Sequence, residues 1–380
     1  MLREGTVKKN EGTDIVNEDM GGGLMRSYRA FLGVLAGVIA AGLIAVAALV
    51  ITIDPFFQYH EPVETFSYVI DNQLSQNPGL AKNTEYNAVL LGSSVTVNFN
   101  TAWFDELFGV SLVKLPYNGA YPRDIVNAME QVEKSGHPVD MVFWGVDVSS
   151  CSGDTEQIKY ELPEYLYDDF IGNDVYYWYN KDVLLDYILK PLLDPSQGTD
   201  PTDYYSTWQL FGYNKWVALN SYTPVPRSGQ DYADDFLLDA VKKNMDVNFC
   251  PMIERHPETQ FYVFFPPYSM LYWYDFERLR QTDAILTNEA YMMERLLAYD
   301  NVRVFFFQDD YEVVADLENY TDMIHYSREV SQHIARSMAE GRGEVDEDNY
   351  REILEGFGRY VHAYDYDAIW DDYEHMRPAD

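Results

Sequence analysis

The sequence of 380 residues has little cysteine and little positive charge. Its two cysteines, Cys151 and Cys250, show neither a CxxC motif nor metal-ligand spacing, so no cysteine metal site is predicted. They fit either one disulfide bond outside the cytosol or two free buried thiols. Only 27 basic residues oppose 62 acidic ones, for a formal charge of −35. Because phosphate binding needs clustered lysine and arginine, this balance argues against nucleic acid and anionic lipid surfaces as partners.

Cofactor motifs are absent as well. The chain has neither a GxGxxG motif nor a P-loop, so neither a dinucleotide site nor a nucleotide-phosphate site is predicted. Six histidines lack the spacing of a metal-ligand set: His60, His137, His256, His333, His362 and His375. We therefore expect no metal and no cofactor.

One long apolar run is present near the amino end. Residues 30–53 are uncharged and long enough to cross a bilayer as a helix. The run is too long for the apolar region of a cleaved signal peptide, and no convincing cleavage site follows it. Arg26 and Arg29 precede it, and no lysine or arginine follows before Lys82. The positive-inside rule therefore predicts a single-pass plasma-membrane anchor, with a cytoplasmic amino terminus and all residues after Asp54 exported.

Composition divides the chain into an anchor and four other segments. These are a disordered cytoplasmic tail at 1–29, a stalk at 54–86, a main extracytoplasmic domain at 87–341 and an acidic carboxyl-terminal tail at 342–380. The tail includes a predicted closing helix at 350–360. The main domain contains an insertion at 152–232, rich in tyrosine, acid and proline, that serves either as a lid or binding wall or as a packed helical subdomain.

Apolar strands alternate with amphipathic helices through the main domain. Strands are predicted at 87–91, 111–115, 141–145, 260–265 and 302–306. Helices are predicted at 101–108, 123–135, 236–255, 276–299 and 327–340. This alternation predicts an α/β fold, with a parallel sheet of about five strands flanked by helices in three layers. Functional side chains are then expected at the carboxyl ends of the strands.

The first predicted strand runs into a sharp turn that contains serine. Its sequence, Asn-Ala-Val-Leu-Leu at 87–91, is broken by Gly92-Ser93-Ser94, and a helix follows. A strand, a tight glycine turn and a helix are how α/β enzymes present a serine hydroxyl at the edge of a sheet. Ser94 is our candidate nucleophile. In the plain alternative, Ser93 or Ser94 only caps the following helix.

A carboxylate and a histidine follow the fifth predicted strand. Asp322 and His325 lie three positions apart, which lets the carboxylate hold the imidazole Nδ1–H and leaves Nε2 free to take a proton from serine. A lone histidine more often packs or caps, and Ser327 is a candidate cap of the next helix. The Asp322–His325 pair and Ser94 nevertheless follow strands of the same predicted sheet.

These residues carry a resemblance to a known superfamily. Gly92-Ser93-Ser94 near the start of the domain and Asp322-x-x-His325 near its end resemble the SGNH (GDSL-like) hydrolases. The anchored layout is similar to the branch that contains alginate O-acetyltransferase proteins and the teichoic-acid D-alanylation protein. Two sequences are also typical of that branch: Phe-Phe-Pro-Pro-Tyr-Ser at 264–269 and Asp-Met-Ile-His-Tyr-Ser at 322–327. The resemblance covers residues 87–341 and the anchor, and it implies an SGNH-type, flavodoxin-like three-layer fold.

The resemblance also implies roles for individual residues. Ser94 is expected to be the nucleophile, His325 the general base and Asp322 the group that orients it. The oxyanion would be held by the backbone N–H of Ser94 and by that of Gly119, which lies in the superfamily's second motif block.

The third motif block departs from the superfamily pattern. Superfamily hydrolases commonly have Gly-x-Asn-Asp there, whereas this chain has Trp144-Gly145-Val146-Asp147. An ionised Asp147 cannot donate a hydrogen bond and would repel an oxyanion. Either Asn118 supplies the missing amide, or Asp147 has a structural or substrate-binding part.

Aromatic residues follow the fourth predicted strand. Tyr268, Tyr272 and Trp273 would form an aromatic wall beside the site and bind substrate, or they simply pack on the domain.

Together these features predict an exported serine esterase or O-acyltransferase that acts on a cell-envelope polysaccharide or a teichoic acid-like acceptor in a bacterium. The resemblance implies a polytopic membrane-bound O-acyltransferase as the partner that delivers the acyl group. Two alternatives stay open: a glycan deacylase, and a non-catalytic glycan-binding or assembly subunit.

Overall fold

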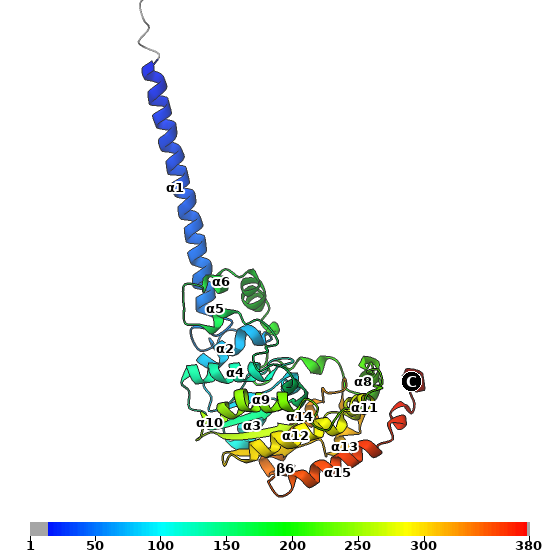
Figure 1. Cartoon of the computed structure of the whole chain (residues 1–380). Coiled ribbons are helices and arrows are strands. Elements are labelled where there is room, and N and C mark those ends of the chain that lie inside the picture. Colours follow the sequence, from blue (N-terminus) through cyan, green and yellow to red (C-terminus); the bar gives the residue numbers. More distant parts are fainter. Residues whose placement is uncertain (1–13, 378–380) are drawn as a thin grey trace, which may run out of the picture.

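A six-stranded sheet forms the centre of the computed structural model, which describes residues 14–377 (Figure 1). The strand order is β2-β1-β3-β4-β5-β6. The strands are β1 (Ala88–Leu91), β2 (Leu112–Lys114), β3 (Met141–Gly145), β4 (Gln260–Phe265), β5 (Val302–Phe306) and β6 (Glu344–Val345). The first five are parallel and β6 is antiparallel to β5. The predicted parallel sheet flanked by helices is confirmed. The sixth strand, only two residues long, is too short to leave a pattern in the sequence.

Helices cover both faces of the sheet. One layer contains α4 (Pro122–Ser135), the helical segment α9–η6–α10 (Leu238–Asn244, Met245–Phe249, Cys250–Glu254) and α12 (Thr282–Leu297). The other contains α3 (Thr101–Phe108) and α14 (Arg328–Glu340), which pack on each other. Strands β1 and β2 are buried along their whole length because both faces are covered.

The remaining helices are short, apart from the first and the last. They are α1 (Asp14–Ile53), α2 (Gln73–Asn83), α5 (Glu164–Tyr167), α6 (Val175–Trp178), the π-helix η3 (Val183–Leu189), α7 (Lys190–Leu193), α8 (Lys215–Ser221), α11 (Met270–Leu279), α13 (Tyr311–Val314) and α15 (Tyr350–Ala363). The single helix predicted at 276–299 is instead two, α11 and α12. Arg280, with φ of 56°, ends α11 in the left-handed conformation.

The apolar amino-terminal run is helical, and the helix extends beyond it. Helix α1 begins at Asp14 and projects from the globular part (Figure 1). Within it, residues 25–53 are long and apolar enough to cross a membrane. The prediction of a disordered tail is therefore wrong for residues 14–29, and residues 1–13 lie outside the described part of the chain.

The segment predicted as a stalk, residues 54–86, is part of the domain. Helix α2 packs against α4, and Phe57, Leu80 and Tyr86 belong to the main hydrophobic core. A Cβ on Gly79 would lie 1.9 Å from the carbonyl oxygen of Phe56, so only glycine allows this approach. The stalk prediction is wrong because one side of the polar helix α2 is buried: Gln76 donates to the carbonyl oxygens of Pro55 and Val69, and Asn77 donates to that of Pro116.

The segment predicted as an acidic tail also belongs to the domain. Strand β6 extends the sheet, and α15 packs on α12 and α11. Its acidic residues face solvent, whereas Leu354, Phe357 and Val361 are buried in the core. The predicted closing helix at 350–360 is confirmed.

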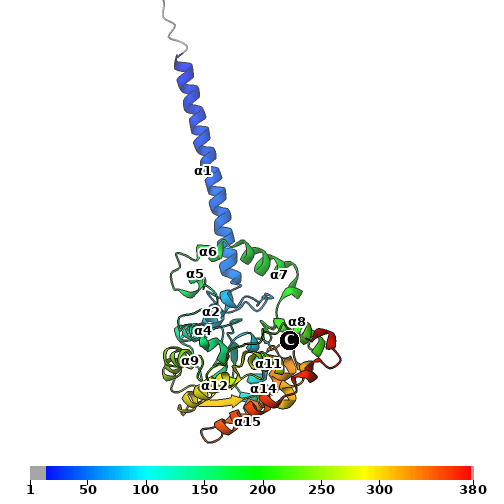
Figure 2. The same cartoon turned by 45° about the vertical axis from the view of Figure 1, so that its right-hand side comes forward.

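The insertion at 152–232 has two structural roles. Its first half, with α5, α6, η3 and α7, encloses the base of α1 (Figure 2). Here Leu166, Tyr177, Val183 and Ile188 form a second apolar cluster with Val50 and Phe56. Its second half returns to the sheet. The insertion is therefore packed on the rest of the protein along much of its length.

The two cysteines are free thiols. Cys151 and Cys250 are both buried and no disulfide joins them. Of the two alternatives left open by the sequence, one disulfide bond or two free buried thiols, the structure has the free thiols.

Candidate active site

Ser94 follows directly on the end of β1. Gly92 has φ of 151°, and a Cβ there would lie 2.4 Å from the Thr96 side chain, so the turn requires glycine. Ser94 then opens a short 3₁₀ turn, Ser94–Thr96. Neither Ser93 nor Ser94 caps α3, because Asn100 does so by accepting the N–H of Ala102. The capping alternative for the serines is therefore wrong.

Ser94, His325 and Asp322 form one hydrogen-bonded chain. The Ser94 Oγ lies 2.7 Å from His325 Nε2, and His325 Nδ1 lies 2.6 Å from Asp322 Oδ2. The other Asp322 oxygen accepts the backbone N–H of Ile324 and of His325 itself, at 2.9 and 2.7 Å. The structure thus brings Ser94 together with an Asp-His pair more than 220 positions away, and the pair has the geometry that its spacing predicts.

The contacts of Asp322 with His325 favour the ionised form of its carboxyl group. Burial by itself would raise the pKa of Asp322. The hydrogen bonds from the His325 ring and backbone and the attraction of a His325 cation outweigh burial, so that the pKa lies below its ordinary value. The carboxylate can therefore hold Nδ1–H through the neutral pH range.

The loop that carries Asp322 and His325 is held by the segment after β4. Ser269 donates both its backbone N–H and its hydroxyl to the carbonyl oxygen of Met323, at 3.2 and 2.8 Å. The Tyr320 hydroxyl donates to the Pro267 carbonyl oxygen at 2.7 Å. Ser327 caps α14, as one alternative expected. The Pro-Pro-Tyr-Ser sequence therefore positions the triad loop.

The predicted aromatic wall is not exposed. Trp273 is fully buried and packs edge-on against Phe357, with ring centroids 5.0 Å apart. Tyr268 and Tyr272 are buried and pack on each other. The substrate-binding assignment of these three residues is corrected, because α11 and the turn before it place their rings in the core.

Asp147 lies beside the serine turn. Leu91 pairs with Trp144 across β1 and β3, so the chain after β3 meets the chain after β1. Burial raises the pKa of Asp147 to about 6, although a hydrogen bond with Ser93 and the charge of His325 oppose the rise. Ser93, Ala120 and Asp147 line one cavity of about 10 Å³, room for no more than one water molecule.

The predicted oxyanion-hole residues lie in the loop after β2. The Tyr117 N–H donates to the Gly92 carbonyl oxygen at 3.1 Å, which fixes this loop against the serine turn. Gly119 is exposed and has φ of 67°. Asn118 is held by Gln73 of α2, which accepts its backbone N–H and donates to its Oδ1. Gln73 lies in the segment predicted as a stalk, so nothing in the sequence connected it with the site.

Trp208 of the insertion stacks on the imidazole of His325. Its ring centroid lies 3.6 Å from that of His325, with an angle of 20° between the rings. Its Nε1–H is buried and has no hydrogen-bond partner within the described part of the chain. Trp208 was missed because it lies far from every motif in sequence, and only its place in an aromatic insertion could have pointed to it.

A buried lysine connects this insertion to the serine loop. Lys114 of β2 donates to the carbonyl oxygens of Val97 and Phe99 at 2.6 and 2.7 Å, and to the Ser206 hydroxyl at 3.3 Å. Burial lowers the Lys114 pKa to about 7, against the pull of the Asp203 carboxylate. The Lys114 ammonium group thus holds Val97, three residues after Ser94, together with Ser206, two residues before Trp208.

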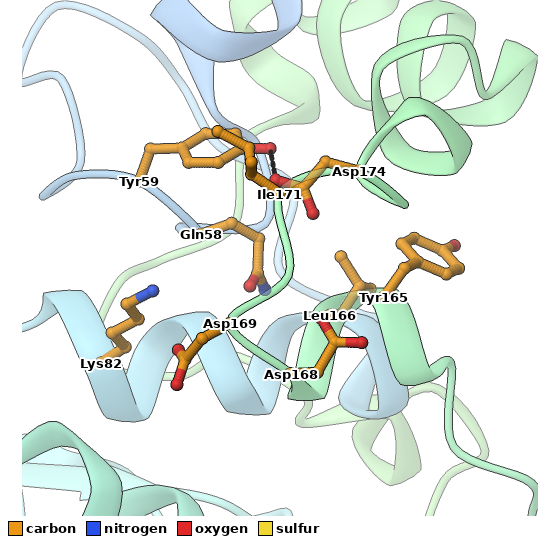
Figure 3. A pocket seen from close by; sticks show the side chains of 9 residues that line it. All are labelled: Gln58, Tyr59, Lys82, Tyr165, Leu166, Asp168, Asp169, Ile171 and Asp174. Atoms are coloured by element: carbon orange, nitrogen blue, oxygen red, sulfur yellow. Dashed lines mark hydrogen bonds between the residues drawn. The ribbon is translucent and has the colours of Figure 1, made fainter.

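The triad is nearly closed to solvent. Ser94 is 9% exposed and His325 is 8% exposed. A larger cavity, of about 180 Å³, lies away from the triad at the base of α1 (Figure 3). Its lining includes Gln58, Tyr59, Lys82 and Asp174. Little of either side chain is therefore open to solvent, and Trp208 covers one face of the His325 ring.

Fold and geometry together define a class: an α/β protein with a parallel sheet, helices on both faces, and a Ser-His-Asp chain beyond the carboxyl ends of the strands. No protein-family model and no curated protein matches this chain. Among solved structures, it is similar to a Streptococcus pneumonia protein provisionally described as a platelet activating factor. The two are 15% identical, with a TM-score of 0.35 over 71% of this chain and 89% of that chain. A likeness this distant carries no argument about activity.

Proposed function

We propose that the protein is a membrane-anchored, extracytoplasmic serine O-acyltransferase or esterase that acts on a cell-envelope polysaccharide or a teichoic acid-like acceptor. The observation that carries this proposal is the Ser94–His325–Asp322 chain, with hydrogen bonds of 2.7 and 2.6 Å. A purely structural serine and histidine would need no ionised carboxylate on the far ring nitrogen.

The reaction proceeds through an acyl-serine. Ser94 Oγ attacks the carbonyl carbon of an acyl ester or thioester while its proton passes to His325 Nε2, and Asp322 stabilises the imidazolium. The tetrahedral intermediate collapses, the leaving group takes the proton from His325, and the acyl group stays on Ser94. A sugar hydroxyl or water then attacks the acyl-serine, with His325 again as base. The N–H groups of Ser94 and Gly119 are the proposed oxyanion donors.

Transfer rather than hydrolysis is the reaction we favour. Ser94 is almost covered, so bulk water has poor access to an acyl-serine. The unpaired Trp208 Nε1–H is a donor that a bound acceptor hydroxyl would satisfy. No acyl-CoA pool exists outside the membrane, and we propose that a polytopic membrane-bound O-acyltransferase delivers the acyl group.

The test is acyl-enzyme formation by the full-length chain in neutral detergent. The chain is incubated with 4-nitrophenyl acetate, and both nitrophenol release and intact mass are measured. We expect an acetyl adduct or turnover that falls at least about 1,000-fold in Ser94→Ala and in His325→Ala. Ser196→Ala, at an exposed serine of the insertion, is the matched control.

The outcomes separate the remaining alternatives. Added oligosaccharide acceptors that capture the acetyl group identify a transferase, whereas release of free acetate alone identifies a deacylase. A folded chain with neither adduct nor turnover, also in the presence of the membrane partner, would make the protein a non-catalytic binding subunit.

A further inference from the structure

The part of the insertion at residues 164–193, here named the collar, exposes an unusual number of apolar side chains. Outside α1, fifteen large apolar side chains of the described residues are exposed, and eight of them lie in the collar. They are Phe170, Ile171, Val175, Tyr176, Tyr179, Leu185, Leu192 and Leu193. Exposures of 66% for Ile171 and 84% for Leu193 are far above what packing on the domain would leave. Such a cluster marks an interaction surface.

The collar is attached to the apolar helix itself. The Tyr179 hydroxyl donates to the carbonyl oxygen of Leu43 at 3.3 Å, well inside the apolar run. At the base of α1, the Tyr177 hydroxyl donates to Asp54 and accepts the N–H of Phe56. Tyr59 donates to Asp174, directly before α6, at 2.7 Å (Figure 3). Helix α1 therefore leaves the domain through the collar, as Figures 1 and 2 show.

The uncharged part of α1 is long enough to cross a bilayer. Residues 30–53 span about 36 Å at the rise of an α-helix, which is longer than a hydrocarbon core of about 30 Å requires. Every residue from 30 to 45 is exposed, and partial burial begins at Val46. This exposed, uncharged part is about 24 Å long. A hydrocarbon core that begins at residue 30 therefore ends about four residues beyond it, at the level of the collar.

We propose that the collar is seated on this membrane, with its exposed aromatic and aliphatic side chains in the boundary between headgroups and acyl chains of the extracytoplasmic leaflet. Tyrosine and tryptophan favour this layer because each has an apolar ring and a polar tip. The collar then holds the catalytic domain at a set height and orientation. The proposal rests on the anchoring part of the proposed function and is independent of the chemistry at Ser94.

Charge indicates which lipids the collar would contact. Residues 164–193 contain six acidic and two basic side chains. Anionic headgroups would be repelled, so the fit is to a neutral, zwitterionic surface held by apolar contacts rather than by charge.

Depth-dependent fluorescence quenching tests the proposal. Full-length chain is reconstituted in phosphatidylcholine nanodiscs that contain lipids with a nitroxide near the top of the acyl chain. A single added cysteine carries the fluorophore, in the variants Tyr176→Cys and Leu193→Cys. Both native thiols are buried, and unmodified chain gives the background labelling. Leu35→Cys in the helix is the positive control, and Val247→Cys, 52% exposed in η6, is the negative control.

We expect at least about a twofold loss of fluorescence at positions 176 and 193, as at position 35, with little change at position 247. Quenching at position 35 alone would overturn the collar proposal and leave the anchor intact. Absence of quenching at position 35 would overturn both. Nitrophenyl acetate turnover by the same samples reports on Ser94 separately, so a failure of the proposed chemistry is recognised independently.

Discussion

Asp147 places a carboxyl group beside the serine turn, where an oxyanion needs donors. Its pKa, raised to about 6 by burial, means that it is mostly ionised at pH 7.5 and mostly protonated at about pH 5. Only the protonated form can donate a hydrogen bond. The negative charge should therefore oppose the reaction in the upper part of the pH range.

We expect Asp147→Asn to raise kcat/KM with 4-nitrophenyl acetate several-fold at pH 8. The gain should shrink below about pH 6, where Asp147 itself becomes neutral. The measurement is the pH profile of kcat/KM for both proteins. A uniform loss across the profile would show instead that the carboxylate has a structural or substrate-binding part.

Trp208 is the second residue with a specific expectation. Its face lies against His325. In the proposed mechanism it would orient the ring, and its π-electrons would stabilise the imidazolium formed when Ser94 is deprotonated. We expect Trp208→Leu to lower kcat about 2- to 30-fold, corresponding to about 0.5–2 kcal/mol, while Trp208→Phe retains most of the activity. Steady-state kinetics of both variants provide the test. A change confined to KM, equal in the two variants, would contradict orientation of His325 and indicate substrate contact.

Helix α15 shows how an element can be misjudged from its composition. It lies in the segment 342–380, whose sequence is acidic overall, yet one face of the helix is apolar, and Phe357 is fully buried against Trp273 and Phe306. Acidic residues on the other face face solvent at no cost. An acidic carboxyl-terminal segment therefore closes the core rather than trailing from it.

We expect Phe357→Ala to lower the free energy of unfolding by about 3–5 kcal/mol, the cost of a large cavity in a core. Glu352→Ala, at an exposed position of the same helix, should change it by no more than about 0.5 kcal/mol. Denaturant unfolding followed by tryptophan fluorescence measures both. Equal, small effects would mean that α15 contributes nothing to the fold.

The insertion connects two regions that lie far apart in the sequence, the base of α1 and the loop that carries His325. Its collar encloses the base of α1, and its later part supplies Trp208 to His325 and Ser206 to Lys114. The packed alternative for the insertion is thus confirmed, and the lid or binding wall stays a prediction. One segment of chain links the base of α1 to His325.

Over the whole protein, the charge of −35 is the main electrostatic feature. Ion pairs such as Arg123–Glu130 are mostly partly exposed and add little stability. Mutual repulsion of carboxylates favours the expanded, unfolded chain, and salt screens that repulsion.

We therefore expect the Tm of the full-length chain in neutral detergent to rise by several degrees between about 10 mM and about 300 mM NaCl, with little further gain. Scanning fluorimetry at fixed pH measures it. Potassium chloride should act equally, since the effect is screening rather than binding. A Tm that falls with salt would mean that favourable ion pairs outweigh the repulsion.

Local signals were enough to predict the centre of the molecule. Periodic apolar runs predicted the five parallel strands, and glycine and serine at 92–94 with an acid and a histidine three apart predicted the site. These features follow from backbone sterics and from spacing within one turn, which the sequence contains directly. The fold class and the contact among Ser94, His325 and Asp322 needed nothing more, whereas the catalytic roles of these residues stay predictions.

Tertiary structure decided everything that depends on contact between distant segments. Contacts across long separations in sequence hold the polar helix α2, the helix α15 of the acidic carboxyl-terminal segment, the collar around α1 and the stack of Trp208 on His325. The composition of a segment gives only its average polarity, whereas its packing depends on which few of its side chains contact another segment. For that reason the wall of Tyr268, Tyr272 and Trp273 proved to be core, and Gln73, Lys114 and Trp208 proved to lie around the candidate site.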